Sequence, residues 1–389
     1  MTDIQHRLNK TAFNDILKTR NLTQATVAER IGVNEKSFSR WVNDGYIQSK
    51  YLLNLTEELD LNDDEMKAVL LLPTYKVFFR KKYLGEVPSE IEERAIELSK
   101  TLFNMTYLNS ESRFCPPNVS KLSSEMEVAN QIRRYTEIDS FKNLQNIISN
   151  LAEQGLEVVV VPFIKLGLNS HGEYESAFTV TDEKRCVIFL DAESAEELLI
   201  FNLCHELCHL FRPDLPFSKI EEKFCNSVAS ELVYPFSFFE NHRTTIEKII
   251  SSKESEQIIS LLNAIKENLG GEIFGIALRL KSLGLLSQKD PLHQKIIGYS
   301  TLIYKNSPKV SETIFSNYNP TQSKIFSAFW DSEDINKMSL LRFFFLLKNS
   351  AISGSISPRK FAELLNVDIG VSDEMFHAWK KKLHQNLEG

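Results

Sequence analysis

Residues 202–210 read Asn202-Leu203-Cys204-His205-Glu206-Leu207-Cys208-His209-Leu210. They lie inside a stretch, residues 195–210, that favours a helix because it contains neither glycine nor proline. Two of its histidines, His205 and His209, are four residues apart, so both imidazoles project from one helical face, one turn apart. Two imidazoles in this arrangement can share one tetrahedral zinc ion. The spacing therefore predicts a metal-binding helix.

Glu206 follows the first histidine directly. Its carboxylate is placed to accept a proton from a water on the metal, because zinc lowers the pKa of such a water toward about 7. A zinc ion that performs chemistry has three protein ligands and one open position for water and substrate. The two histidines supply two ligands, so the third must come from elsewhere in the chain.

The candidate third ligand lies in the next helix. A break with two prolines, residues 211–216, ends the first helix, and a new helical pattern begins near Lys219. Glu222 lies near its start, and Asn226, one turn later, can steady the site through a hydrogen bond. Glu221 is the alternative ligand, since it lies nearer the centre of the apolar stripe of that helix. Helical spacing alone does not choose between these two acids.

The composition is that of a globular protein with two or three domains, with 42% hydrophobic and 25% charged residues in a chain of 389. No stretch is apolar enough to span a bilayer, and the first residues lack the apolar segment of a signal peptide. Five cysteines without a CxxC pair indicate a reducing compartment and argue against a cysteine-based zinc finger. We expect a cytoplasmic protein that does not bind membranes, with Cys204, Cys208 and Cys225 in its core.

The N-terminal residues have a helical pattern of their own, in short apolar pieces separated by turn signals. Thr23 and Asn34 are placed to cap a second and a third helix. Residues 1–50 contain eight Lys/Arg and five Asp/Glu, a net charge of +3, in a chain whose total charge is −7. This suits a module that binds double-stranded DNA. The module resembles a Cro/repressor-type helix-turn-helix, and this resemblance implies that its third helix offers Glu35, Lys36, Ser39, Arg40 and Asn43 to the major groove, with Gln24 near the backbone.

Three β-strands are expected just before the metal-binding helix. Residues 157–163 form a β-branched run, while residues 176–180 and 186–190 flank a short polar turn and predict a hairpin. An edge strand beside a zinc cleft can pair with an extended peptide through main-chain hydrogen bonds. We therefore expect this hairpin to hold an extended segment of the substrate, and cleavage to fall in an exposed loop or linker of the substrate protein.

Three separated motifs resemble the ImmA/IrrE metallopeptidase family. They are the hairpin with the metal-binding helix, the segment 222–235 and the segment 274–285, and together they cover about residues 120–287. The second motif keeps the glutamate, asparagine and proline of that family. Cysteines stand at several positions where the family has small residues, and none of these departures removes a ligand. The resemblance implies one Zn²⁺ per chain, with His205, His209 and Glu222 as ligands.

The N-terminal module is similar to the Cro/repressor-type helix-turn-helix domain. The two resemblances together imply a zinc endopeptidase with an attached DNA-binding domain, in which Glu206 is the catalytic residue. Such an enzyme cleaves a protein substrate, typically a repressor of stress, mobile-element or defence genes. Some relatives that fuse both modules act as transcription factors without proteolysis and use the peptidase-like domain as a sensor. The intact His-Glu-x-x-His run favours the peptidase, because a purely structural metal site has no need of Glu206.

These patterns together predict a mainly α protein with a small α+β zincin-like metallopeptidase domain, made of a three-stranded sheet and the His-Glu-x-x-His helix. An all-α helix-turn-helix domain precedes it. We expect the domains at residues 1–66 (DNA binding), 67–115 (helical connector), 116–290 (metallopeptidase) and 291–389 (helical). The last region matches no known motif, and homodimer formation, substrate recognition and covering of the cleft are the roles considered for it.

Overall fold

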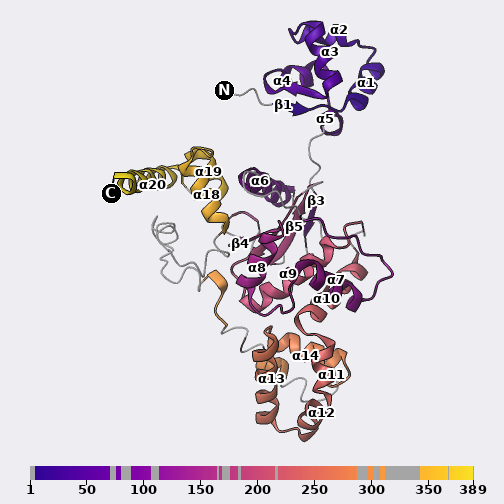
Figure 1. Cartoon of the computed structure of the whole chain (residues 1–389), viewed down its shortest axis with the longest axis vertical. Coiled ribbons are helices and arrows are strands. Elements are labelled where there is room, and N and C mark those ends of the chain that lie inside the picture. The colour runs from indigo at the N-terminus through magenta and orange to yellow at the C-terminus, as the bar shows by residue number, and fades with distance from the viewer. Residues whose placement is uncertain are drawn as a thin grey trace. The chain divides into compact units, whose positions relative to one another are not determined.

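The structure is a computed structural model. It describes residues 5–70, 76–79, 89–106, 114–163, 166–168, 176–182, 185–214, 218–286, 296–300, 303, 307–311, 342–366 and 368–388. The protein is mainly helical, as the sequence predicts (Figure 1). The chain divides into two compact units, residues 1–76 and residues 77–389.

The described residues of the first unit form five short helices around one apolar core. They are α1 (Lys10–Thr19), α2 (Gln24–Arg30), α3 (Glu35–Asp44), α4 (Ser49–Glu58) and α5 (Asp63–Val69). The hydroxyl of Thr23 accepts from the backbone N–H of Thr26, and the side chain of Asn34 accepts from that of Lys36. Both predicted caps are therefore present. Gly45 ends α3 with φ of 73°, a conformation that glycine adopts without strain.

This unit is not wholly helical, because two short strands join its ends. β1 (Gln5–Arg7) pairs antiparallel with β2 (Tyr46–Gln48), with His6 opposite Ile47. Each strand has only three residues, too few for the alternating pattern that identifies a strand in a sequence. The pairing depends on a contact between segments about forty residues apart.

The second unit is built on a mixed sheet with the strand order β3-β5-β6-β4. The three predicted strands are β4 (Glu157–Val161), β5 (Ala177–Thr181) and β6 (Cys186–Asp191). β5 and β6 form the predicted antiparallel hairpin, and β4 runs parallel to β6. The outer strand β3 (Lys76–Phe79) comes from the predicted helical connector. Four apolar and basic residues do not distinguish a short strand from a helical turn, and the pairing decides it.

The position of β3 overturns one expectation. We expected the hairpin of residues 176–180 and 186–190 to offer an edge strand that pairs with a substrate peptide. Both strands are instead internal, because β5 lies between β3 and β6, and β6 lies between β5 and β4. A peptide therefore cannot add to β5 without displacing β3.

Helices cover both faces of this sheet, which is why β4 and β6 are buried along their whole length. One face packs against α8 (Leu144–Glu153) and α9 (Glu196–Leu210), with α7 (Glu125–Thr136) and α10 (Lys219–Val233) beyond them (Figure 1). The other face packs against α6 (Ser89–Thr106) and α18 (Arg342–Ile352).

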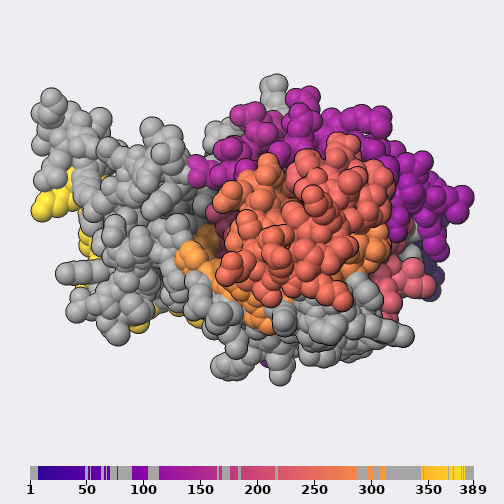
Figure 2. Space-filling model, turned by 90° about the horizontal axis from the view of Figure 1, so that it is seen from below, coloured from indigo at the N-terminus to yellow at the C-terminus, as the bar shows by residue number. Residues whose placement is uncertain are grey.

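Further helices extend the second unit. α11 (Phe236–Asn241), α12 (Arg243–Ser252), α13 (Ser255–Leu269) and α14 (Ile273–Ser282) follow α10 and form one rounded surface in salmon and orange (Figure 2). The last helices of the chain are α19 (Pro358–Leu365) and α20 (Ile369–Glu388). Among the described residues, no helix is both long and apolar enough to cross a membrane.

The C-terminal helices pack on the connector helix α6. Arg94 of α6 donates to the backbone carbonyls of Glu363 and Leu364 at 2.6 and 2.8 Å, and Lys360 forms an ion pair with Glu97 at 2.5 Å. Phe343 and Phe344 are buried in α18. This part of the region 291–389 is thus joined to the sheet layer. Its residues 312–341 lie outside the described part of the chain.

Candidate metal centre

α9 carries both histidines and is buried on nearly every side. Eleven of its fifteen residues are buried, including His205, Glu206 and His209. Such burial is unusual for polar side chains, because removing them from water costs free energy unless they find partners. The partners of these three come from two neighbouring elements, the strand β5 and the helix α10.

Three predicted residues meet in the space between α9 and α10. The Nε2 atoms of His205 and His209 lie 3.0 Å apart. One carboxylate oxygen of Glu222 is 3.3 Å from the Nε2 of His205, and the other is 3.4 Å from the Nε2 of His209. Each residue thus offers one ligand atom to a common point, and an ion placed there would contact all three.

These separations fit a tetrahedral metal. Zinc binds nitrogen and carboxylate oxygen at about 2.0–2.2 Å, so two ligand atoms at a tetrahedral angle lie about 3.3 Å apart. The two imidazole nitrogens are 3.0 Å apart, and the nearest Glu222 oxygens, a different one for each ring, lie 3.3 and 3.4 Å from them. Two imidazoles and one carboxylate are also donor types that zinc accepts. The geometry and the donor set therefore suit a zinc-sized divalent cation.

The opposite nitrogens of both rings are held by α10. Nδ1 of His205 is 3.1 Å from the Oδ1 of Asn226, and Nδ1 of His209 is 3.6 Å from the Sγ of Cys225. When the Nδ1–H of His205 donates to Asn226, its Nε2 carries a lone pair that faces the common point. Asn226 thus contacts the site as the sequence suggested, although its partner is His205 and not Glu222.

The electrostatics of the cluster favour positive charge. Burial alone would raise the pKa of Glu222, but its contacts with His205 and His209 lower it to about 2. Burial alone would lower the pKa of His209, but its contacts with Cys225 and Glu222 raise it well above the usual value. The cluster therefore stabilises a cation beside an ionised carboxylate, and a divalent metal satisfies the same requirement.

Glu206 is completely buried beside the two histidines. The hydroxyl of Thr179 in β5 donates to its Oε2 at 2.6 Å, a short distance typical of a hydrogen bond to a charged oxygen. Thr179 lies on the same sheet face as Ala177, the face that packs against α9. The sheet thus fixes the orientation of the Glu206 carboxylate.

Glu221, the rival ligand, has a different partner. Its two carboxylate oxygens accept from Arg212 at 2.6 and 3.1 Å, and both side chains are buried. Arg212 also donates to the carbonyl of Ser120 and lies over the ring of Phe224, 4.1 Å from its centroid. Glu221 therefore joins the end of α9 to the start of α10, while the next residue, Glu222, faces the histidines.

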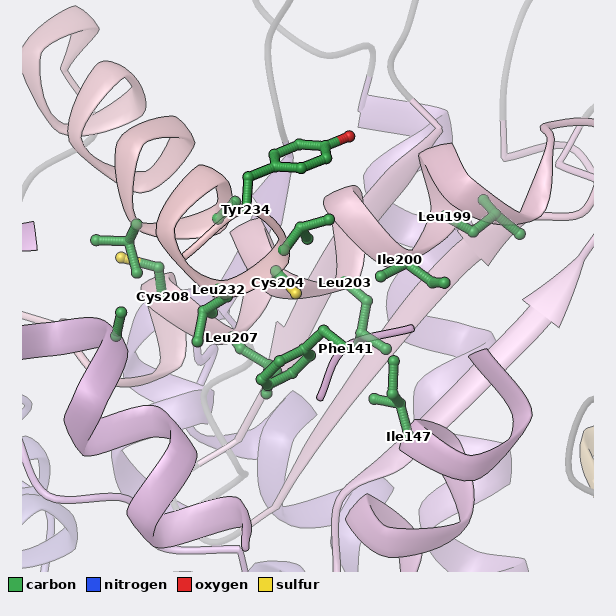
Figure 3. Packing of buried hydrophobic residues seen from close by; sticks show 14 of the residues in the cluster. Phe141, Ile147, Leu199, Ile200, Leu203, Cys204, Leu207, Cys208, Leu232 and Tyr234 are labelled. Carbon is green, nitrogen blue, oxygen red and sulfur yellow. The ribbon is translucent and has the colours of Figure 1, made fainter. Parts of the chain in front are cut away.

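Cys204 and Cys208 lie in the apolar core, as expected (Figure 3). All five cysteines are free thiols. Cys225 is also buried, but it contacts His209, so it is more than a core residue. A hydrogen bond with Cys208, together with burial, raises the pKa of the Cys225 thiol above its usual value. The thiol therefore stays protonated and neutral beside His209.

The predicted DNA-contacting residues all lie in the other unit, on α2 and α3. Four of them are exposed on α3: Glu35, Lys36, Arg40 and Asn43. Ser39 and Gln24 are half-buried, and the amide of Gln24 donates to Asn14 at 3.1 Å. Asn43 accepts from Lys10 at 2.8 Å. The exposed side chains thus share one helix face, while Gln24 and Asn43 already have partners within the unit.

Sequence reasoning missed three residues of the centre: Thr179, Arg212 and Cys225. Nothing in the strand pattern distinguishes Thr179 from any other threonine. The position of Cys225, three residues after Glu222, does put it on a neighbouring helix face, and this spacing was a usable signal. The pair of Arg212 with Glu221 crosses the proline break, where helical spacing gives no information.

Comparison with known proteins gives no relative. No protein-family model, no curated protein and no solved structure matches this chain.

Proposed function

We propose that this protein is a zinc-dependent endopeptidase, with the ion held by His205, His209 and Glu222. The observation that carries the proposal is the convergence of these three side chains at separations of 3.0–3.4 Å, which suit a tetrahedral ion. A divalent zinc supplies Lewis acidity, lowering the pKa of a water and polarising the carbonyl of a peptide bond. Three protein ligands leave one position for these molecules, whereas structural zinc sites usually have four.

Glu206 is the general base of this proposal. It takes the proton from the attacking water and passes it to the amine that leaves as the peptide bond breaks. The hydrogen bond from Thr179 holds the carboxylate in one orientation, which such a proton transfer requires. Asn226 holds His205 so that its Nε2 remains a ligand. The resemblance of the motifs to the ImmA/IrrE family is consistent with these roles.

The proposal is tested on the full chain with zinc added to one equivalent. We expect cleavage of peptides in a proteome-derived library, and of partner proteins on co-expression with small helix-turn-helix repressors. Glu206→Gln is expected to bind zinc as the wild type does and to lose at least about 1,000-fold in rate, because an amide takes up no proton. Glu240→Gln, on the exposed surface of α11, is the matched control. Cleavage by Glu206→Gln at the wild-type rate would exclude this mechanism and leave a metal site without peptidase chemistry.

For residues 1–66 we propose binding to double-stranded DNA through α3. Its support is the cap of Asn34, the short turn from α2 and the exposed polar face with Lys36 and Arg40. A DNA-binding unit joined to a peptidase fits control of transcription by cleavage of a repressor. The same unit would serve a regulator without proteolysis, and the Glu206→Gln experiment separates these two functions.

A further inference from the structure

A cleft of about 510 Å³ opens beside the metal centre, between α9, α10 and α14. Its apolar wall consists of Leu198, Phe201, Phe274 and Leu278, and the last two are exposed to 42% of their surface. Asn226, which contacts the Nδ1 of His205, also lines the cleft. The cleft therefore adjoins the candidate metal centre at Asn226, and it has the size of a site for a small ligand or a side chain.

Helical spacing sets the distance between cleft and centre. On α9, Phe201 precedes His205 by four residues, and on α10 the cleft residue Ser230 follows Asn226 by four. Four residues of a helix advance about 6 Å, which is roughly the length of two residues of an extended peptide. A peptide held at the metal thus brings over this cleft a side chain that lies within about two residues of the cleaved bond.

The charged groups around the cleft do not balance. Arg279 pairs with Glu231, and Lys266 pairs with Glu197 at 2.8 Å. Neither of these two pairs includes Glu272, whose carboxyl group also lines the cleft. Within the described part of the chain, its Oε1 is buried and has no hydrogen-bond partner. A buried carboxylate oxygen without a partner costs free energy, and a cation entering the cleft would remove that cost.

The titration of Glu272 agrees with this imbalance. Burial and the nearby negative charge of Glu197 raise its pKa to about 7, and Lys266 offsets only part of the effect. Glu272 lies at the start of α14 but forms no side-chain cap there. The fold of α14 therefore does not depend on this carboxyl group.

We propose that the cleft is a substrate subsite that accepts an arginine or lysine side chain within about two residues of the cleaved bond. The aliphatic stem packs against Phe201, Phe274 and Leu278, and the charged head reaches Glu272. Arginine and lysine combine such a stem and head in one side chain, whereas an apolar residue would leave the acid without a partner. This inference deepens the proposed peptidase function and rests on it for the position of the scissile bond.

The first test measures binding and needs no catalysis. The full-length, metal-free protein is titrated with N-acetyl-arginine amide and with the uncharged analogue N-acetyl-citrulline amide. We expect the arginine probe to bind at least about tenfold more tightly, with an affinity that rises as the pH increases through 7 and Glu272 ionises. Glu272→Gln should abolish the preference, while Glu267→Gln, an exposed acid on α13, should keep it. Equal binding of the two probes, or no binding of either, overturns the proposal.

The second test uses the zinc-loaded protein and a peptide library. We expect the cleavage sites to be enriched in arginine or lysine on one side of the cut, and Glu272→Gln to lose this enrichment while it still cleaves. Cleavage without a basic preference overturns the subsite and leaves the peptidase. Binding of the arginine probe without any peptide cleavage overturns the peptidase and leaves a cation-binding cleft.

Discussion

The helices α9 and α3 carry the two sets of functional candidates in opposite ways. α9 buries eleven of its fifteen residues, and each polar side chain of its site contacts β5 or α10. α3 buries only Phe38 and Val42 of its ten residues and presents Lys36 and Arg40 to solvent. The candidate metal centre is therefore organised before any ligand arrives, whereas the proposed DNA-binding surface would take its final side-chain arrangement from its partner.

The largest effects should appear at the adjacent acids Glu221 and Glu222. Glu222→Ala is expected to lower zinc affinity by more than about 100-fold, because it removes a ligand. Glu221→Ala should keep the zinc but destabilise the fold by about 3–5 kcal/mol, because Arg212 is left buried without its partner. Metal content after dialysis and urea unfolding measure the two losses. A folded Glu221→Ala protein that has lost its zinc would reverse the assignment.

Substitutions of Thr179 test how far the proposed catalysis depends on a fixed orientation of the Glu206 carboxylate. Thr179→Val removes the hydrogen bond to Glu206 and keeps the shape of the side chain. We expect kcat to fall about 10–100-fold, with KM and zinc affinity unchanged. Thr179→Ser restores the donor and should restore most of the rate, which a purely packing role for the methyl group would not allow. Steady-state kinetics on one cleaved peptide would distinguish the two roles.

Substitutions on the exposed face of α3 should have smaller effects on binding than those in the candidate metal centre. Replacing both Lys36 and Arg40 by alanine is expected to reduce DNA affinity about tenfold in low salt and to leave zinc binding unchanged. The slope of log affinity against log salt should fall by about two, since each phosphate contact releases about one counterion. Fluorescence anisotropy with random duplex DNA provides the measurement. An unchanged affinity and slope would exclude this face from DNA binding.

The smallest effect concerns Glu272, which is only partly buried, unlike the histidines of the candidate metal centre, and whose Oε1 has no hydrogen-bond partner among the described residues. Burial and Glu197 raise its pKa to about 7, above the ordinary value of 4.5, so the unfolded chain loses this proton first as the pH rises. Its ionisation therefore lowers the free energy of unfolding as the pH rises from 4.5 to 7, and the whole loss is present above pH 7. Because the group is partly exposed, we expect Glu272→Gln to gain only about 1 kcal/mol at pH 8.

Urea unfolding of metal-free protein at pH 4.5 and pH 8 measures this difference. The gain of Glu272→Gln over the wild type should be present at pH 8 and absent at pH 4.5, with Glu267→Gln unchanged at both. An equal gain at the two pH values would show that the substitution acts through packing and not through charge.

Much of the local structure could be predicted because its causes lie within a few residues. Thr23 and Asn34 cap their helices through backbone groups two or three positions away. The strands β4, β5 and β6 follow from β-branched runs and a polar turn. β1, β2 and β3 are three or four residues long, and what makes them strands is a partner distant in the sequence. Patterns this short do not differ between strand and helix.

The sequence by itself determined that His205 and His209 share one helix face, because the period of the helix leaves no other arrangement. It also placed two adjacent acids, Glu221 and Glu222, at the start of the next helix as the candidates for the third ligand. Only the tertiary structure decided between them, by bringing Arg212 to Glu221 and the histidines to Glu222. It likewise joined Thr179 to Glu206 and, among the described residues, left the Oε1 of Glu272 without a hydrogen-bond partner in the cleft. Spacing fixes contacts within a helical turn, whereas contacts between elements depend on how those elements pack.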